Sequence, residues 1–275
     1  MVESAWNAGI RFFDTAPLYG HGLAERRLGA VLSSKPRDEF VLATKVGRLL
    51  RADAPPEPGQ AYKGVPPVNP VFDFSYDGVM RSVDESLTRL GFDRIDILHI
   101  HDPDDHFEEA LAGAYRALDR LRADGSIRAV GAGMNQSEML VRFAREADFD
   151  CFLLAGRYTL LDRSGATELL PVCAERRIAI IAGGVFNSGI LADPRPGATF
   201  NYTTAPPDLV RRAEELKAAC DRAGVDLKAA AIQFPLRNPT VATVLTGCRS
   251  VTEVDENVRA FETDVPDELW RALDA

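Results

Sequence analysis

The sequence alternates short apolar runs with longer stretches in which apolar residues recur at helical spacing, and this rhythm constrains the fold most. Strands are predicted at Ile10–Phe13, Phe40–Thr44, Ile95–His101, Ala129–Gly133, Phe152–Ala155, Ile178–Ala182 and Val241–Thr246. Helices are predicted at Ala24–Leu32, Asp77–Leu90, Phe107–Ala123, Glu138–Ala147, Thr167–Arg176, Pro207–Ala223 and Leu227–Leu236. Repeated strand–helix units imply a parallel sheet, and this many units without a linker favour a closed (β/α)8 TIM barrel. A doubly wound open sheet is the structural alternative.

Composition excludes several classes of protein. The 275 residues, 46% hydrophobic and 27% charged, suffice for one large core, so we expect one domain over residues 1–275. A formal net charge of -9 argues against nucleic acid and anionic membranes as partners. No apolar run is long enough to span a membrane, and the first residues lack a signal-peptide pattern. The four scattered cysteines predict reduced thiols in a cytoplasmic protein.

The predicted strands number seven, whereas a barrel of this class has eight. The opening stretch VESAWNAG is typical of the end of a helix that follows a strand. We therefore expect the first strand to be missing from this chain, through a misplaced start or a truncation. The expected result is a seven-stranded, incompletely closed barrel.

Two segments interrupt the rhythm. Residues 48–76 are rich in Pro and Gly and carry the aromatic residues Tyr62, Phe72, Phe74 and Tyr76, which favours a binding loop. The second segment, residues 192–207, follows the sixth predicted strand. Both are expected at the C-terminal face of the barrel, over the site.

Three consecutive strands end in ionisable residues. Asp14, Lys45 and His101 each fall on the face that carries alternate apolar residues of the strand, and Tyr19 follows Asp14 by five positions. At one barrel rim these groups make a proton-transfer site. A free tyrosine has a pKa of about 10, and a lysine cation lowers it. The aspartate neutralises the lysine, and the histidine polarises a carbonyl by donating a hydrogen bond. Such chemistry accompanies hydride transfer, which requires a nicotinamide cofactor.

The stretches FFDTAPLYG, LATKVGR, LHIHDPD, GAGMNQSEML, AGRYTLLDR, FNSGIL and GCRSVTEVDENV resemble the aldo-keto reductase family, in the family's order over nearly the whole chain. The resemblance is closest to the bacterial NAD(P)-dependent aldose dehydrogenases, a group acting on L-fucose, D-threo-aldoses and pyridoxal. It implies a catalytic tetrad of Asp14, Tyr19, Lys45 and His101. Tyr19 is then the acid/base, Lys45 tunes it, Asp14 holds Lys45, and His101 orients the reacting oxygen.

The resemblance also implies contacts with the cofactor. Asn135 matches the residue that binds the nicotinamide amide, but the family's glutamine and stacking aromatic fall on Ala155 and Gly183. Phe186 is the expected substitute for the aromatic. The pyrophosphate segment corresponds to Asn187, Ser188, Gly189 and Leu191, and the adenosine segment to Gly247, Arg249, Ser250, Glu253 and Asn257.

Glu253 stands where many relatives carry an arginine that binds a 2′-phosphate. A carboxylate repels a phosphate and accepts hydrogen bonds from a free ribose hydroxyl, so NAD is the expected cofactor. NADP stays possible because Arg249 could reach a 2′-phosphate.

The expected reaction is oxidation of a small sugar at C1, with the oligomeric state left open. Pyridoxal is the alternative substrate, and a cofactor-binding homologue without turnover is a second alternative. A metal-dependent hydrolase is a third, because HIHDPDDH places His99 and His101 on one strand face, with Asp102, Asp104 and His106 following. The preferred interpretation makes His99 a core residue one layer below the rim, and the DPDD charges the solvated, capping start of the next helix.

Overall fold

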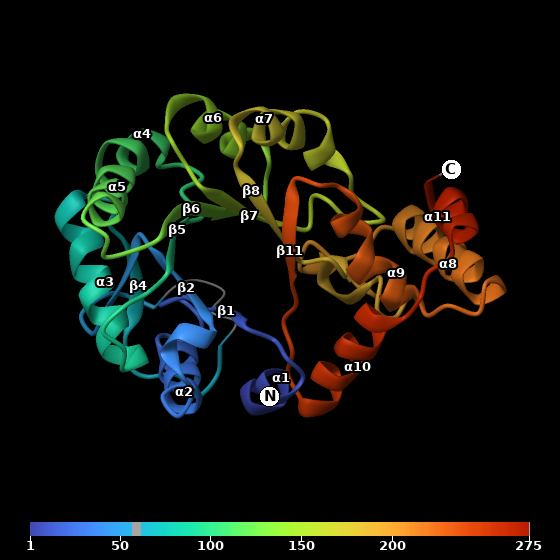
Figure 1. Ribbon diagram of the computed structural model, residues 1–275, viewed down its shortest axis with the longest axis horizontal. Helices are drawn as coiled ribbons and strands as arrows, with labels where there is room; N and C mark the ends of the chain where they lie inside the picture. The colour runs from blue at the N-terminus through green and yellow to red at the C-terminus, as the bar shows by residue number, and fades with distance from the viewer. Residues whose placement is uncertain (57–61, 275) are drawn as a thin grey trace.

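The computed structural model describes residues 1–56 and 62–274, and its centre is a sheet of seven parallel strands (Figure 1). The strands follow one another in chain order around a barrel, each hydrogen-bonded to the next. They are β1 (Phe12–Asp14), β2 (Val41–Val46), β5 (Ile97–His101), β6 (Ala129–Met134), β7 (Cys151–Ala155), β8 (Ala179–Gly183) and β11 (Val241–Leu245). Each lies within two residues of a predicted boundary, so the barrel prediction is confirmed.

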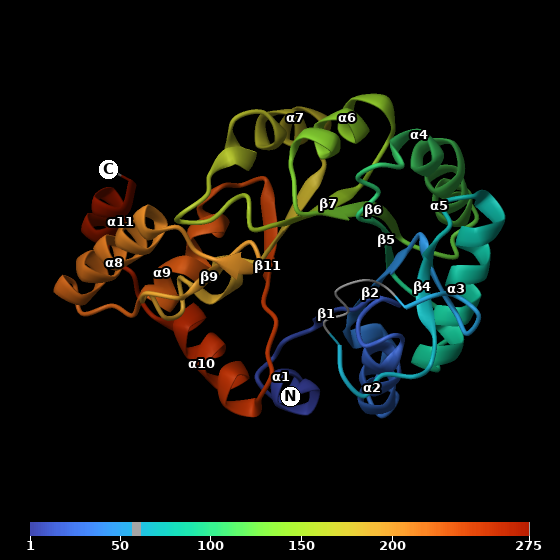
Figure 2. The same ribbon diagram turned by 180° about the vertical axis from the view of Figure 1, so that it is seen from behind.

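Helices surround the strands on the outside, as Figures 1 and 2 show from opposite sides. They are α1 (Val2–Asn7), α2 (Leu23–Leu32), α3 (Tyr76–Leu90), α4 (Phe107–Glu109), α5 (Arg116–Ala123), α6 (Glu138–Glu146), α7 (Leu169–Arg176), α8 (Pro207–Arg222), α9 (Leu227–Gln233), α10 (Val251–Glu262) and α11 (Asp267–Asp274). The helix predicted over 107–123 runs from α4 to α5 through a π-helical turn, Ala110–Tyr115. In the described ranges, no helix has the length and apolar content needed to cross a membrane.

Both interrupting segments contain short hairpins. Strand β3 (Arg48–Arg51) pairs antiparallel with β4 (Asn69–Phe72), and β9 (Thr199–Phe200) pairs with β10 (Thr203–Thr204). The predicted binding loop is thus partly a hairpin that leaves the barrel directly after β2. Its residues 57–61 lie outside the described part of the chain.

Two glycines let neighbouring elements approach closely. A Cβ on Gly29 would meet the Leu90 carbonyl oxygen at 1.9 Å, so glycine is needed where α2 contacts the end of α3. Within the barrel, Gly131 lies opposite His99, and a Cβ there would stand 2.2 Å from the His99 ring. The His99 side chain is fully buried, which confirms the prediction that it is a core residue below the rim.

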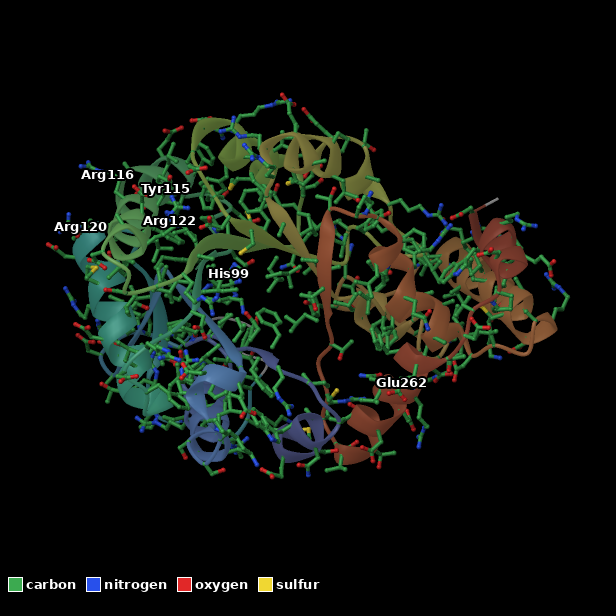
Figure 3. All side chains as sticks on the ribbon, viewed as in Figure 1. His99, Tyr115, Arg116, Arg120, Arg122 and Glu262 are labelled. Carbon is green, nitrogen blue, oxygen red and sulfur yellow. The ribbon has the colours of Figure 1, made fainter. Side chains whose placement is uncertain are left out.

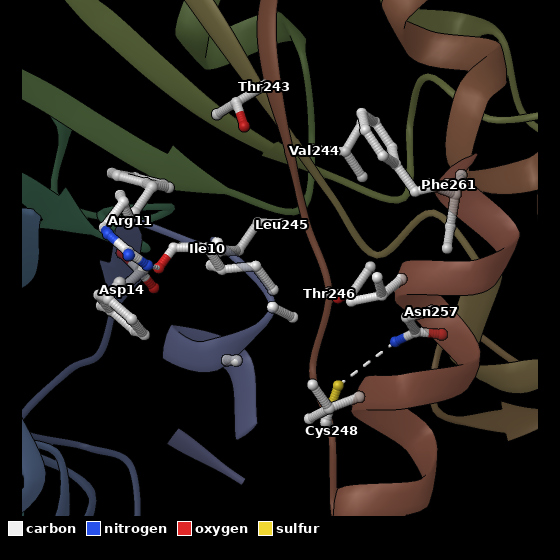
Figure 4. Close-up of a pocket in the computed structure, with 18 of the residues that line it drawn as sticks. Ile10, Arg11, Asp14, Thr243, Val244, Leu245, Thr246, Cys248, Asn257 and Phe261 are labelled. Carbon is white, nitrogen blue, oxygen red and sulfur yellow. Dashed lines mark hydrogen bonds between the residues drawn. The ribbon is translucent and has the colours of Figure 1, made fainter. Parts of the chain in front are cut away.

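The barrel is open along one seam. Among the described residues, β1 pairs with β2 and β11 pairs with β8, but β1 and β11 do not pair with each other. A cavity of about 610 Å³ lies between them, lined by both strands and by residues of α1 and α10. Figure 4 shows Ile10 and Asp14 on one side of it and Thr243 and Leu245 on the other. The prediction of an incompletely closed, seven-stranded barrel is confirmed.

We expect the two strands at the seam to be the least protected part of the barrel. Their outward N–H groups have no strand partner across the cavity, whereas β5 and β6 are paired on both sides. Hydrogen–deuterium exchange followed by mass spectrometry will show faster exchange in peptides covering β1 and β11 than in peptides covering β5 and β6. Equal protection of all four strands would mean that the seam is closed in solution.

Candidate active site

Four side chains meet at the C-terminal edge of the barrel. Asp14 is the last residue of β1, Lys45 lies near the end of β2, and His101 is the last residue of β5. Tyr19 lies in the turn between β1 and α2. Because neighbouring parallel strands end at one edge, residues far apart in sequence converge there.

The Lys45 ammonium is held between two oxygens. Lys45 Nζ donates to Asp14 Oδ2 at 2.5 Å and to the Thr15 carbonyl oxygen at 2.9 Å. The two charged side chains are only 2% and 3% exposed. Burial lowers the pKa of Lys45, but the charges of Asp14 and Tyr19 outweigh it and hold the pKa above its ordinary value. Lys45 is therefore a permanent cation beneath the rim.

Tyr19 lies beside both Lys45 and His101. Lys45 Nζ lies 4.7 Å from the Tyr19 ring centroid, and the Tyr19 and His101 rings meet edge to face with centroids 5.7 Å apart. Burial raises the pKa of Tyr19, and the nearby Lys45 cation opposes that rise. The Lys45 cation lowers this pKa, as expected, but desolvation of the phenolate exceeds that attraction, so the net pKa of Tyr19 lies above its ordinary value. The Tyr19 hydroxyl is accordingly protonated at neutral pH.

His101 is a neutral hydrogen-bond donor. Burial, followed by the charges of Lys45 and Arg48, holds the pKa of His101 well below its ordinary value. A neutral imidazole carries one N–H, which suits it to orient a substrate oxygen beside Tyr19.

Two charged residues lie beside these four side chains: Arg48 was not singled out from the sequence, and Asp102 was named only as a possible ligand in the metal-hydrolase alternative. Asp102 follows His101 directly, and its Oδ2 lies 3.5 Å from His101 Nε2. Arg48, in β3, donates from Nη2 to the same Oδ2 at 3.3 Å. The prediction that the DPDD carboxylates cap the next helix is wrong in the described chain, since His106 holds the N-cap position without a side-chain bond. The position of Asp102 immediately after a rim histidine was the signal available in the sequence.

The nicotinamide side of the rim is only partly as expected. Asn135 follows β6 and is exposed at the strand end. Phe186 follows β8 and is half-buried, with part of its ring packed on the core. A side chain at Gly183 would press on Leu153 at 3.3 Å, so an aromatic residue does not fit there without movement.

The predicted pyrophosphate segment uses its side chains internally. Asn187 is buried, accepting from Thr159 Oγ1 at 2.6 Å and donating to the Gly156 carbonyl oxygen at 3.1 Å. Leu191 is fully buried, and Ser188 Oγ accepts from the Tyr202 backbone at 3.0 Å. What this segment can offer a ligand is its backbone.

The predicted adenosine segment begins α10. Ser250 caps the helix, accepting from the Glu253 N–H at 3.1 Å, while Glu253 accepts from both the backbone and the guanidinium of Arg249. Asn257 donates to Cys248 Sγ at 3.3 Å beside the seam cavity (Figure 4). Open space above the Cα atoms of Gly189 and Gly247, together with the exposed amide of Asn135 and the 92% exposed Arg249 side chain, fits a dinucleotide.

The metal-hydrolase alternative lacks a ligand set in the described ranges. There, no group of three or more His, Cys, Asp or Glu side chains is arranged to hold a metal ion. His99 instead lies inside the barrel, whereas Tyr115, Arg116 and Arg120 lie at the outer face (Figure 3).

Comparison with known proteins agrees with this geometry. A model described as the aldo/keto reductase family matches residues 1–275. The chain belongs to this family. It is accordingly an oxidoreductase of the kind that uses a nicotinamide cofactor, with the family's barrel.

Two relatives are similar over nearly the whole chain. A D-threo-aldose 1-dehydrogenase of Pseudomonas sp is 44% identical over 285 residues, 99% of this chain and 85% of the relative. A pyridoxal 4-dehydrogenase of Microbacterium luteolum is also 44% identical, over 99% of this chain and 86% of the relative. Among solved structures, the holo form of an aldo-keto reductase from Bacillus halodurans matches with a TM-score of 0.78 and 25% identity, over 99% of this chain and 84% of that one.

Removing one charge of the buried Asp14–Lys45 pair should lower the free energy of unfolding more than replacing both residues by apolar ones. Asp14→Asn leaves an uncompensated ammonium in the barrel, and we expect a loss of about 3–5 kcal/mol in the free energy of unfolding. The double variant Asp14→Leu, Lys45→Met removes both charges and should recover most of that loss. Urea unfolding of both proteins measures the difference. A double variant as unstable as the single one would show that charge burial is not the cause.

Proposed function

We propose that this aldo/keto reductase is an NAD-linked aldose dehydrogenase that oxidises a small sugar at its C1 hydroxyl. The observation that carries the proposal is the assembled set of Asp14, Tyr19, Lys45 and His101 at the rim. It occurs in a chain 44% identical to a D-threo-aldose 1-dehydrogenase.

Each of the four residues has a role that follows from its contacts. His101 donates a hydrogen bond to the reacting oxygen, and the Tyr19 hydroxyl exchanges a proton with that oxygen. Lys45 stabilises the Tyr19 phenolate while the proton is absent, and Asp14 keeps Lys45 charged and in place. The bound nicotinamide supplies the hydride-accepting ring. Asn135 would hold the nicotinamide, the backbone of 187–191 would hold the pyrophosphate, and Arg249 and Ser250 would hold the adenosine end.

Pyridoxal is the second candidate substrate, because an equally similar relative is a pyridoxal 4-dehydrogenase. An absorbance screen for reduced nicotinamide, with aldoses and pyridoxal against NAD and NADP, separates the two. Turnover of pyridoxal alone would replace the sugar proposal. Absence of turnover with any substrate, in a protein that binds the cofactor, would favour a non-catalytic homologue.

Tyr19→Phe removes the proposed acid/base while keeping the ring. We expect kcat to fall by about 10²–10⁴-fold, with the affinity for NAD nearly unchanged. Steady-state kinetics and calorimetric titration of NAD measure the two quantities. An unchanged kcat in the folded variant would remove Tyr19 from the mechanism.

The preference for NAD rests on the Arg249–Glu253 pair. Glu253 Oε1 accepts from Arg249 Nη2 at 3.0 Å, so the guanidinium that could bind a 2′-phosphate is already neutralised by a carboxylate. Hydrogen bonds from the backbone and the guanidinium of Arg249, together with its charge, hold the pKa of Glu253 below its ordinary value, and the carboxylate stays ionised at neutral pH. An incoming phosphate therefore meets a negative charge where a ribose hydroxyl would find an acceptor.

Glu253→Gln should shift this preference toward NADP. Without the carboxylate, Arg249 is released and the repulsion disappears, so the ratio of kcat/KM for NADP over NAD should rise by about fivefold or more. Glu262→Gln, which removes an exposed carboxylate at the far end of α10 (Figure 3), is the matched control and should leave the ratio unchanged. A wild-type enzyme that already prefers NADP would refute the assignment.

We also place the enzyme in the cytoplasm. Its four cysteines are unpaired, and burial raises the pKa of Cys151 and Cys173 to about 12, which makes these thiols inert rather than poised for oxidation. Fractionation of the native cells tests this location.

A further inference from the structure

An unusual backbone conformation turns Asp102 toward the active site. Its φ is 43°, in the left-handed region that residues other than glycine rarely adopt and that aspartate tolerates better than most. The Asp102 N–H donates to the Gly133 carbonyl oxygen at 3.0 Å, which holds the turn against the end of β6. The turn brings a carboxylate oxygen to 3.5 Å from His101 Nε2.

Arg48 holds this carboxylate from the other side. Its Nη2 lies 3.3 Å from Asp102 Oδ2, and its guanidinium packs over the Phe72 ring at 4.5 Å from the centroid. The two side chains keep exposures of 12% and 22%, in contrast to the fully enclosed pair of Asp14 and Lys45. Asp102 and Arg48 thus form a second ion pair at the rim that solvent, and a substrate, can reach.

The pair lies next to the position of the reacting oxygen. The geometry favours the tautomer with the proton on Nε2, because that nitrogen faces the Asp102 carboxylate at 3.5 Å, and an oxygen that accepts from it lies about 3 Å away. The charge of Asp102 also acts on the pKa of Tyr19, and that of Arg48 on the pKa of His101, so both reach the tetrad. A group on the carbon next to the reacting carbon therefore falls within reach of Asp102.

The hydrogen-bonding capacities of Asp102 and Arg48 determine which group binds there. A carboxylate only accepts hydrogen bonds and a guanidinium only donates them, whereas a hydroxyl does both. An alkyl group at the same place would leave two partly desolvated charged groups with poorer hydration. We propose that Asp102, positioned by Arg48, is the subsite for the substrate hydroxyl on the carbon adjacent to the one oxidised. This deepens the proposed function and rests on it: the substrate class is α-hydroxylated, as in an aldose.

D-Arabinose and 2-deoxy-D-ribose, which differ only in the C2 hydroxyl, test the subsite with NAD as cofactor. The wild-type kcat/KM should favour D-arabinose by about 100-fold, because sites built to bind a hydroxyl strongly reject analogues that lack it. Asp102→Gly, which the left-handed backbone accommodates, should reduce that preference to about threefold or less. Asp105→Asn removes an exposed carboxylate from the same loop and should keep the wild-type preference. An undiminished preference in Asp102→Gly overturns the proposal.

Reduction of butanal with NADH separates recognition from catalysis. Butanal carries no hydroxyl on C2, so its turnover by Asp102→Gly should stay within about threefold of wild type. A loss of butanal turnover as large as the loss with D-arabinose would overturn the subsite, since Asp102 would then act through His101 rather than on the sugar. If Asp102→Gly does not fold, as judged by circular dichroism, Arg48→Met carries the same comparison.

A binding measurement keeps the proposal distinct from the assigned activity. In the Tyr19→Phe background with NAD bound, calorimetry should show D-arabinose binding at least about tenfold more weakly when Asp102→Gly is added, while 2-deoxy-D-ribose is unaffected. A wild-type enzyme that oxidises no aldose, yet shows this difference in binding, would refute the proposed reaction and support the subsite. Equal loss for both sugars overturns the subsite whatever the activity.

Discussion

The ion pair between Lys45 and Asp14 is the constraint on which the rest of the site depends. Two charges at 2% and 3% exposure are stable only when their geometry is good, and here Nζ is shared between a carboxylate and the Thr15 carbonyl oxygen. That requirement aligns the ends of β1 and β2. It also supplies the cation that Tyr19 needs, since burial alone makes the phenolate unfavourable.

The environment of this pair is linked to the open side of the barrel. Asp14 lines the cavity between β1 and β11, so the strand that carries the counter-ion is also an edge of the seam. Water entering there would weaken the attraction between Lys45 and Asp14 by raising the local dielectric. The degree of closure of the barrel therefore affects the pKa of Tyr19 through the Lys45–Asp14 ion pair. The seam itself lies on the side of the sheet away from β5 and His101.

The rim combines two ion pairs with different exposures. The enclosed pair of Asp14 and Lys45 serves proton transfer, where a low dielectric strengthens every charge. The half-open pair of Asp102 and Arg48 retains hydrogen-bonding capacity toward solvent and suits recognition of a polar substrate. Sequence order explains their closeness, because Asp102 directly follows His101 and Arg48 begins the hairpin three residues after Lys45.

The sequence by itself determined the strand–helix order, the barrel, the unpaired seam and which four side chains meet at the rim. Apolar periodicity and the polarity of strand ends are local properties, and each predicted strand lies within two residues of its place in the structure. Only the tertiary structure decided the net direction of the Tyr19 pKa, the internal use of the Asn187 side chain, and the partnership of Asp102 with Arg48. The first depends on burial, and the other two on contacts between residues 28 and 54 positions apart, which no local pattern encodes. From the sequence, Asp102 is interpreted as a solvated charge, because its left-handed turn toward the site exists only once β5 and β6 are paired.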